Sequence, residues 1–277
     1  MTQTANPLKQ FFRQPALFLK LPSDGQFWAA GSIDMPPNKE LPVLPMTAID
    51  EITYRTPDAL FNGSAVTTIF SSCVPNIKDP WSIPQIDVDL LLTAVRIASY
   101  GHEMEISSKC PHCEVENDFV LDLRTIIDRI KTPDYNNKVI IGDLELSFKP
   151  LSYFQVNESA KRQFEEQKAM QLSAEGSLTE SEKLSVLSLA LSNITKLTID
   201  SISDSIERIK TPDGVVEDPI FIKEFFANCD SSVFARIKDY AVALRTSTEM
   251  EQLKLNCKDC EKEYTQSFTL DMSNFFV

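Results

Sequence analysis

Four of the six cysteines form two C-x-x-C pairs, Cys110/Cys113 and Cys257/Cys260. The two thiolates of one such turn can bind a single metal ion, while backbone amides of the turn donate hydrogen bonds to the sulfurs. Two pairs together supply the four tetrahedral ligands of a structural zinc site and leave no open position for catalysis. The sequence therefore predicts one structural zinc ion per chain, bound by all four of these cysteines.

Each pair could instead be a redox-active dithiol or two free thiols. Redox C-x-x-C pairs usually stand at a helix N-terminus, where the helix dipole lowers a thiol pKa. Here the pairs follow alternating segments that predict strands, Met104–Ser108 and Leu253–Leu255, and no helical pattern comes directly after them. This strand-turn-strand pattern favours a zinc ribbon with two knuckles. His112, inside the first turn, could replace a cysteine as ligand, but with four thiols present we expect it at the surface.

The unusual feature of this ribbon is the 143 residues between Cys113 and Cys257, against about 15 to 20 in common ribbons. Loop closure costs only about 0.6 kcal/mol per doubling of length, whereas apparent zinc affinities are about 10 kcal/mol or more. Both knuckles are followed by similar apolar segments, FVLDL at Phe119–Leu123 and FTLDM at Phe268–Met272. We therefore expect two similar half-sites separated by a long insertion.

Helical signals dominate the rest of the chain. Residues Ile86–Tyr100 are apolar on most of their circumference and are followed by Gly101, which predicts a buried helix with a glycine stop. Val139–Phe148 reads as a β-hairpin that turns at Gly142-Asp143. A capping box at Thr179-x-x-Glu182 opens a later helix.

These patterns predict an α+β fold class that is mainly helical, with a small zinc-ribbon-like β module split by a helical insertion. The expected segments are an extended N-terminal arm with short strands (1–46), a helical core with the first zinc knuckle and a hairpin (47–150), a helical insertion (151–248), and the second zinc knuckle with a C-terminal strand (249–277).

Charge and hydropathy limit the class of partner. Lys and Arg number 27 against 40 Asp and Glu, and the resulting net charge of -13 disfavours binding to a phosphate backbone. Pro7, Pro15 and Pro22 interrupt the N-terminal segment, so no apolar run has signal-peptide or membrane-spanning length. We expect a soluble cytosolic protein with neither a nucleic-acid nor a membrane partner. The reducing compartment also favours metal-binding thiolates over disulfides.

Catalytic motifs are missing from the sequence. The chain has two histidines and seven glycines, and contains neither G-x-x-x-x-G-K-[ST] nor G-x-G-x-x-G. No Ser/His/Asp or Cys/His set can be assembled from so few histidines. Cys73 and Cys229 stand alone in apolar helical contexts and are expected to pack in the core. The sequence therefore predicts a non-enzymatic protein.

Several motifs carry a resemblance to a known family. They are TPD-x-L-x-NG at Thr56–Gly63, SC-x-P-x-IKDPW at Ser72–Trp81, D-x-D-x-LL-x-A-x-RIA-x-YG at Asp87–Gly101, and CPHC at Cys110–Cys113. With them, residues 41–123 resemble the base plate protein family of T-even-type contractile-tailed bacteriophages. The resemblance implies a structural or assembly component of the tail baseplate, in the hub region, that binds other tail proteins such as the hub or tape-measure protein. It places the protein in the virion or, during assembly, in the host cytoplasm.

The sequence also allows a different class of function, a zinc-ribbon adaptor in transcription or nucleic-acid handling. Ribbons that bind nucleic acid carry Lys and Arg around their knuckles. Here the acidic residues around the pairs outnumber the lysines: Glu114, Glu116, Asp118, Glu261 and Glu263 against Lys109, Lys258 and Lys262. Docking is therefore the favoured function, through the arm or the polar segment Asn157–Leu172. The sequence indicates no oligomeric state.

Overall fold

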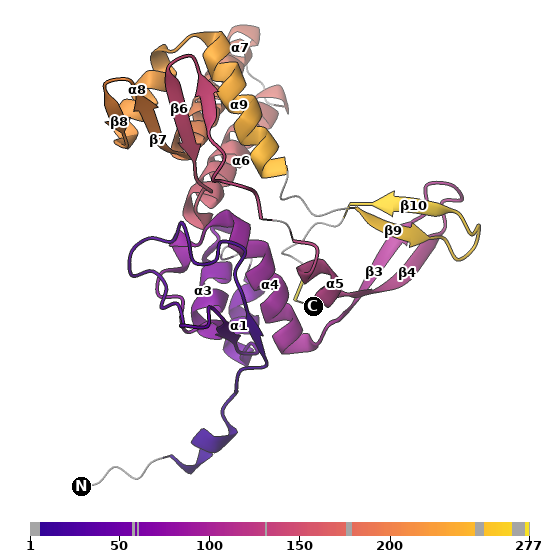
Figure 1. Ribbon diagram of the computed structural model, residues 1–277. Coiled ribbons are helices and arrows are strands. Elements are labelled where there is room, and N and C mark those ends of the chain that lie inside the picture. The colour runs from indigo at the N-terminus through magenta and orange to yellow at the C-terminus, as the bar shows by residue number, and fades with distance from the viewer. Residues whose placement is uncertain are drawn as a thin grey trace. The chain divides into compact units, whose positions relative to one another are not determined.

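The computed structural model describes residues 6–56, 59, 61–130, 132–175, 179–246, 252–267 and 275–276. The chain folds as two compact units (Figure 1). The first unit contains Met1–Pro80, Asp89–Ile130 and Met250–Val277, and the second contains Trp81–Val88 and Lys131–Glu249. Eight α-helices and several small antiparallel sheets lie within the described residues, so the predicted α+β class is confirmed.

The helical part of the first unit is built from α1 (Ala48–Tyr54), α3 (Ser64–Cys73) and the part of α4 (Gln85–Tyr100) that begins at Asp89. The predicted buried helix is α4, and its buried side chains include Leu91, Leu92, Ala94 and Val95. It ends at Gly101, whose φ of +87° suits a residue without a side chain and whose N–H donates to the carbonyl of Ile97 over 3.0 Å. The helix and its stop therefore follow from local sequence.

The N-terminal segment contains a short 3-10 helix, η1 (Pro7–Phe11), and two strands, β1 (Leu17–Leu19) and β2 (Leu41–Val43), that pair antiparallel with each other. A second 3-10 helix, η2, spans Pro80–Ser82. In β2 buried and partly exposed residues alternate, and Leu41 and Val43 are fully buried on one face of the strand. The segment is therefore anchored to the first unit from Arg13 onward.

Arg13 makes that anchor. Its guanidinium donates to the carbonyls of Pro45 and Ser72 over 2.6 and 2.7 Å and lies 3.4 Å from the Asp50 carboxylate. Asp50 is 5% exposed and also accepts from Thr47, its partner in the capping box of α1, and from the Ser72 hydroxyl. A buried carboxylate held by several donors is stabilising only while its partners remain.

Arg13→Ala is expected to destabilise the first unit by about 1–3 kcal/mol, because Asp50 loses its cationic partner and two carbonyls lose a donor. Urea unfolding measures the change, and limited proteolysis should cut the N-terminal segment faster. Lys20→Ala is the matched control, since its 3.8 Å ion pair with Glu40 is exposed and contributes well under about 1 kcal/mol. Equal effects of the two substitutions would contradict the anchor.

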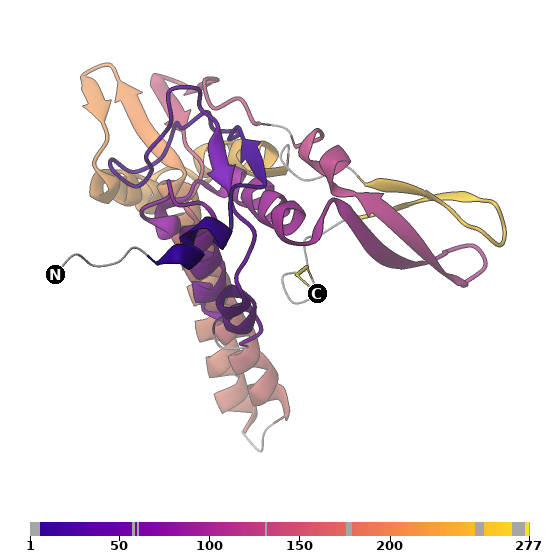
Figure 2. The same cartoon turned by 90° about the horizontal axis from the view of Figure 1, so that it is seen from below.

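Two β-hairpins complete the first unit. The first pairs β3 (Glu103–Lys109) with β4 (Glu116–Asp122) and leads into α5 (Leu123–Ile127); the second pairs β9 (Leu253–Asn256) with β10 (Glu263–Gln266). They lie side by side, although they come from distant parts of the sequence (Figures 1 and 2). The strands predicted before each cysteine pair are confirmed, whereas the predicted strand at Phe268–Met272 lies outside the described residues.

The second unit contains a four-stranded antiparallel sheet in the order β5-β6-β7-β8, formed by Val139–Ile141, Leu144–Phe148, Ile206–Thr211 and Gly214–Val216. The hairpin predicted at Gly142-Asp143 is confirmed as β5–β6. Between the paired central strands β6 and β7 the chain forms α6 (Tyr153–Glu175) and α7 (Glu180–Asp204), which lie side by side as a helical hairpin (Figure 2). The amide of Asn193 donates to Glu166 over 2.7 Å and sets the register of the two helices.

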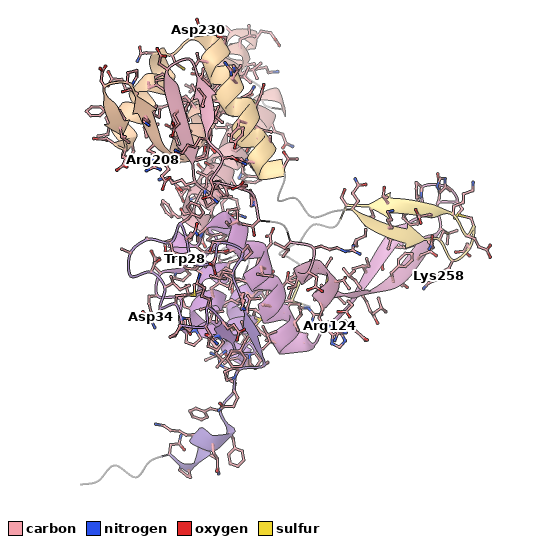
Figure 3. The ribbon with its side chains drawn as sticks, in the orientation of Figure 1. Trp28, Asp34, Arg124, Arg208, Asp230 and Lys258 are labelled. Carbon is pink, nitrogen blue, oxygen red and sulfur yellow. The ribbon has the colours of Figure 1, made fainter. Side chains whose placement is uncertain are left out.

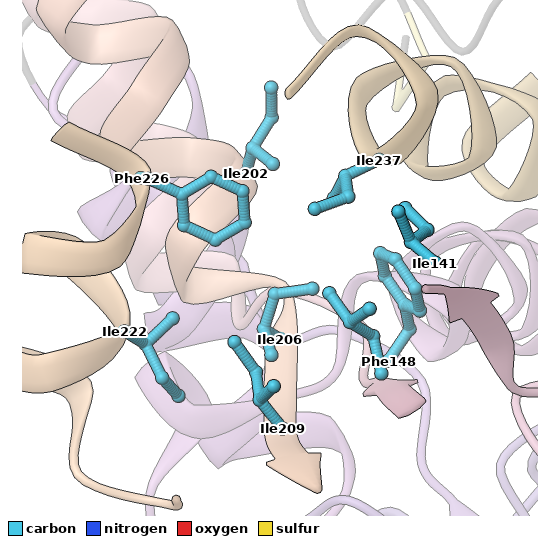
Figure 4. Close-up of a cluster of buried hydrophobic side chains, with 9 residues drawn as sticks. Ile141, Phe148, Ile202, Ile206, Ile209, Ile222, Phe226 and Ile237 are labelled. Carbon is cyan, nitrogen blue, oxygen red and sulfur yellow. The ribbon is translucent and has the colours of Figure 1, made fainter. Parts of the chain in front are cut away.

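The core of the second unit lies on one face of this sheet. Helices α7, α8 (Pro219–Asn228) and α9 (Ser231–Thr246) supply one side of the core, and β5, β6 and β7 supply the other. The buried side chains shown in Figure 4 include Ile141, Phe148, Ile202, Ile206, Ile209, Ile222, Phe226 and Ile237. β-Branched and aromatic side chains on alternate strand positions give this sheet one apolar face.

The structure corrects one expectation inside residues 151–248. The capping box at Thr179 and Glu182 does open a helix, but Ile206–Thr211 and Gly214–Val216 are strands, not helix. These strands are short, and a β-bulge interrupts the pairing of β7 with β6, so their alternation is hard to recognise. The Thr211 hydroxyl accepts hydrogen bonds from the backbone amides of Asp213 and Gly214 and closes the turn between β7 and β8.

Candidate metal centre

The two C-x-x-C pairs lie in the turns of the two hairpins, and the backbone of both turns has the same conformation. In each turn the N–H of the first cysteine donates to the carbonyl five residues later, and its carbonyl accepts from the N–H four residues later, over 2.9–3.0 Å. The residues after the second cysteines, Glu114 and Glu261, have φ of 60° and 57°. A left-handed conformation is unusual for glutamate, and both turns have it at the equivalent residue.

The structure brings all four predicted ligands together. The sulfurs of Cys110 and Cys260 are 3.7 Å apart, those of Cys113 and Cys257 are 3.5 Å apart, and all four lie within 4.8 Å of one another. A disulfide would need about 2.05 Å, whereas tetrahedral Zn–S bonds of about 2.3 Å place sulfurs about 3.8 Å apart. The four thiols are a possible metal site, and both their number and their spacing fit a zinc ion.

Three donors near the sulfurs favour the thiolate form. The backbone N–H of His112 donates to the Cys110 sulfur over 3.4 Å, and the N–H of Cys260 donates to the Cys257 sulfur over 3.5 Å. The Asn117 side-chain amide also donates to Cys257, over 3.5 Å. Such bonds orient thiolates and spread their charge when a metal binds. The His112 side chain is exposed, as expected from the sequence.

Sequence reasoning missed the buried polar side chains that connect the two hairpins. Asn117 of β4 is 4% exposed, and its carbonyl oxygen accepts from the N–H of Lys258 over 2.9 Å. Tyr264 of β10 donates through its hydroxyl to Ser108 of β3 over 2.9 Å. Asn117 and Tyr264 each stand seven residues after the first cysteine of their pair, so equivalent positions reach across to the opposite hairpin. Alignment of the two cysteine pairs would have identified these residues, because both occupy the same position relative to their pair.

A small apolar cluster surrounds the sulfurs. Its buried members are Cys110, Leu123, Ile126, Leu253, Leu255, Cys257 and Tyr264. Two of them are cysteines of the site, and the aliphatic ones come from α5 and from β9 of the second hairpin. So few apolar side chains contribute little stability by burial alone, and small modules of this kind usually depend on a metal or a disulfide. The metal would therefore be the main element holding the hairpins together.

The thiol pKa values show which cysteine loses its proton most easily without metal. Backbone N–H donors from Cys260 and Asp259 lower the pKa of Cys257 to about 6. At Cys113 the Val115 N–H favours the thiolate, but burial and the neighbouring sulfurs outweigh it and raise the pKa to about 12. Metal binding must therefore expel protons from the cluster, and its affinity falls as the pH falls because protons compete for the sulfurs.

The two remaining cysteines lie apart from the cluster. Cys73 is fully buried at the end of α3, and burial together with the charge of Asp50 raises its pKa to about 12. Cys229 is partly buried at the edge of the second unit's core, and burial raises its pKa. A thiol with a raised pKa is a poor nucleophile, so the prediction that both residues serve packing agrees with their surroundings.

The surface around the cluster is mixed in charge, and two of its lysines, Lys109 and Lys258, contact other protein groups. Lys258, which is labelled in Figure 3, donates to the carbonyl of Asp118 and lies 5.5 Å from the centre of the Phe119 ring. Lys109 lies 3.7 Å from Glu114. Neither pair stands at a helix N-terminus, because strands β4 and β10 follow them. The four thiols form a possible metal site, and their position between strands differs from that of redox C-x-x-C pairs, which usually stand at a helix N-terminus.

Comparison with known proteins gives one family. A protein-family model described as T4 bacteriophage base plate protein matches residues 44–277, which include all four cysteines of the cluster. No curated protein and no solved structure gives a significant match. Within the described residues, no helix has both the length and the hydropathy needed to span a membrane.

Proposed function

Since the chain belongs to the T4 bacteriophage base plate protein family, we propose that it is a non-enzymatic component of the baseplate hub region that docks to other tail proteins and binds one structural zinc ion. The observation that carries this proposal is the family match over residues 44–277. A baseplate protein interacts with other phage tail proteins, and the hub and tape-measure proteins are the partners we propose. Its place is the virion tail, or the host cytoplasm while the tail is being assembled.

The proposed zinc ion gives the two hairpins one common anchor. Cys110, Cys113, Cys257 and Cys260 fill a tetrahedral sphere, so the ion would stabilise the fold and would not bind substrate. The β-hairpins then form a zinc-ribbon-like module whose halves come from segments 47–150 and 249–277 of a mainly helical chain. The arm 1–46 and the insertion 151–248 complete the proposed division.

The arm is the docking surface that we favour. Leu8, Phe11 and Phe12 are 60, 76 and 55% exposed, and no residue of η1 is buried. Exposed aromatic residues near an anchored base are typical anchors for a partner's pocket, because they bury large apolar area at low entropic cost. Arg13 holds the base of this segment against the first unit, so the apolar side chains start from a defined position.

Deletion of residues 1–12 tests the docking role in a phage that lacks the intact gene. Complementation with the full chain should restore complete tails, whereas the shortened chain should fold and keep its metal but fail to join the baseplate. Electron microscopy counts the complete tails, and mass spectrometry of purified particles shows whether the protein stays in the virion. Complete tails in the absence of the protein would refute the baseplate role.

A nucleic-acid adaptor is not favoured. Duplex binding requires positive charge that replaces counterions, and two of the three lysines around the cysteine pairs, Lys109 and Lys258, already contact protein groups. The net charge of -13 acts in the same direction. The protein should accordingly show no salt-sensitive binding to duplex DNA.

A further inference from the structure

The sheet of the second unit has a polar face opposite its core. Glu145 pairs with Lys210, and Ser147 pairs with Arg208, on the two central strands β6 and β7. These residues alternate with Leu146 and Ile209, which are buried in the core, so the paired polar side chains share the other face. Val215 of β8 pairs with Lys210 and extends this face by one strand.

A cavity of about 280 Å³ lies on this polar face. It is lined by Lys138, Glu145, Ser147, Arg208, Lys210 and Val215. Ser147 is only 6% exposed, and its hydroxyl accepts from Nε of Arg208 over 3.3 Å. This bond fixes the guanidinium of Arg208, whose planar group of N–H donors matches the two oxygens of a carboxylate. Figure 3 shows Arg208 on the sheet of the second unit.

The charge of the cavity is opposite to that of the whole chain. Three cationic side chains line it with a single carboxylate, Glu145, which Lys138 contacts directly. The bond from Lys138 lowers the pKa of Glu145, so that carboxyl stays ionised and partly neutralised by its neighbour. Two nearby acidic residues, Glu207 in β7 and Glu217 directly after β8, do not line the cavity. A cationic cavity in a chain with a net charge of -13 attracts anions locally.

The surroundings decide which kind of anion fits. Ile140 and Val215, 67 and 55% exposed, border the cations on the same face of the sheet. A nucleic acid would extend its many phosphates beyond so small a cavity, over a chain that repels them. A peptide that alternates carboxylate and apolar side chains instead matches both the cations and the exposed aliphatic residues.

From this match we propose that the cavity binds an acidic, apolar segment of a neighbouring tail protein, with Arg208 and Lys210 as the residues that bind its carboxylates. The identity of the neighbour rests on the proposed baseplate function. The binding itself does not, because it can be measured with the purified chain and a peptide.

The test uses a fluorescently labelled peptide with the sequence Glu-Leu-Glu-Leu-Glu-Leu, titrated with the full chain at low salt and followed by fluorescence anisotropy. The wild-type chain should bind the peptide, and Arg208→Gln and Lys210→Gln should each weaken binding about 5-fold or more. Lys238→Gln is the matched control, because it removes the same charge from an exposed position on α9 outside the cavity. It should change the affinity by less than about 2-fold.

Three further probes separate the sources of an anion. The corresponding Gln-Leu peptide should not bind, and inorganic phosphate should compete only weakly. Tighter binding of an oligothymidylate than of the acidic peptide would overturn the proposal, as would equal losses in Lys238→Gln and Arg208→Gln. Circular dichroism spectra of the variants check that the exposed substitutions leave the fold intact. The two experiments test separate claims. If the peptide does not bind the purified chain, the phage complementation result still stands. If the shortened chain fails to restore tails, the measured peptide affinity still stands.

Discussion

Cys110→Ser and Cys257→Ser, each made alone, are expected to abolish metal binding and to unfold the two hairpins of the first unit. The two residues belong to different hairpins, yet their sulfurs lie within one cluster 4.8 Å or less across. A serine hydroxyl is a poor zinc ligand, and removal of one of four thiolates opens the tetrahedral sphere. Apparent zinc affinities of about 10 kcal/mol or more contribute directly to folding, so the hairpins should lose most of their stability.

Elemental analysis of the purified chain measures this loss, with zinc and iron determined together. The wild-type protein should contain about one zinc per chain. Cys229→Ser is the matched control, because this thiol lies in the second unit and outside the cluster, and it should keep its zinc. Loss of metal from only one of the two cluster variants would contradict a shared site. Iron in place of zinc would keep the cluster but change the metal, and a stably folded, metal-free wild-type chain would refute the site.

Phe148→Ala is expected to destabilise the second unit by about 3–5 kcal/mol. Phe148 is 1% exposed and packs against the ring of Tyr240 at 4.9 Å between centroids. Removal of its ring leaves a cavity between the sheet and helix α9, and the surrounding isoleucines cannot fill it fully. Urea unfolding followed by circular dichroism measures the change.

Ile140→Ala gives the matched comparison within the same sheet, because Ile140 is 67% exposed and its truncation should cost less than about 0.5 kcal/mol. Metal content should stay at the wild-type value in Phe148→Ala, since all four cysteines belong to the first unit. If Phe148→Ala also released the metal, the two units would not be independent in stability. Together with the cysteine variants, this substitution separates the contributions of the two units.

The sequence alone was sufficient for elements whose signals are local. The apolar circumference of α4, the glycine at 101, the turn at Gly142 and the capping box at Thr179 all lie within a few residues of the structure that they specify. The spacing within each cysteine pair is equally local, and the matching pattern of the two pairs, 143 residues apart, predicted which four thiols meet. The α+β class followed from these features, whereas the family followed from the resemblance carried by the motifs at Thr56–Gly63, Ser72–Trp81, Asp87–Gly101 and Cys110–Cys113. The identity of the metal stays a prediction.

Non-local features could not be predicted in the same way. Strands β6 and β7 pair with each other although the helical hairpin α6–α7 separates them in the sequence. Both strands are short, so their sequences show little apolar–polar alternation. Asn117 looks like any polar strand residue until the second hairpin is placed beside it. The cationic cavity likewise requires Lys138, directly before β5, and Glu145, in β6, to meet Arg208, which lies in β7 beyond the α6–α7 hairpin. Each of these features arises from tertiary packing.

The separation of the two cysteine pairs also fixes the delay between the synthesis of the first pair and that of the second. Ribosomes add about 5–20 residues per second, so the 143 residues between Cys113 and Cys257 take about 7–30 s to appear. During that interval the first pair has emerged with only half of its ligands, while the segment Lys131–Glu249 of the second unit becomes available to fold. A metal ion bound by all four cysteines would complete its coordination only when Cys260 leaves the ribosome. We therefore expect the first unit to mature after the second, and a chain interrupted before Cys257 would lack two of the four proposed ligands.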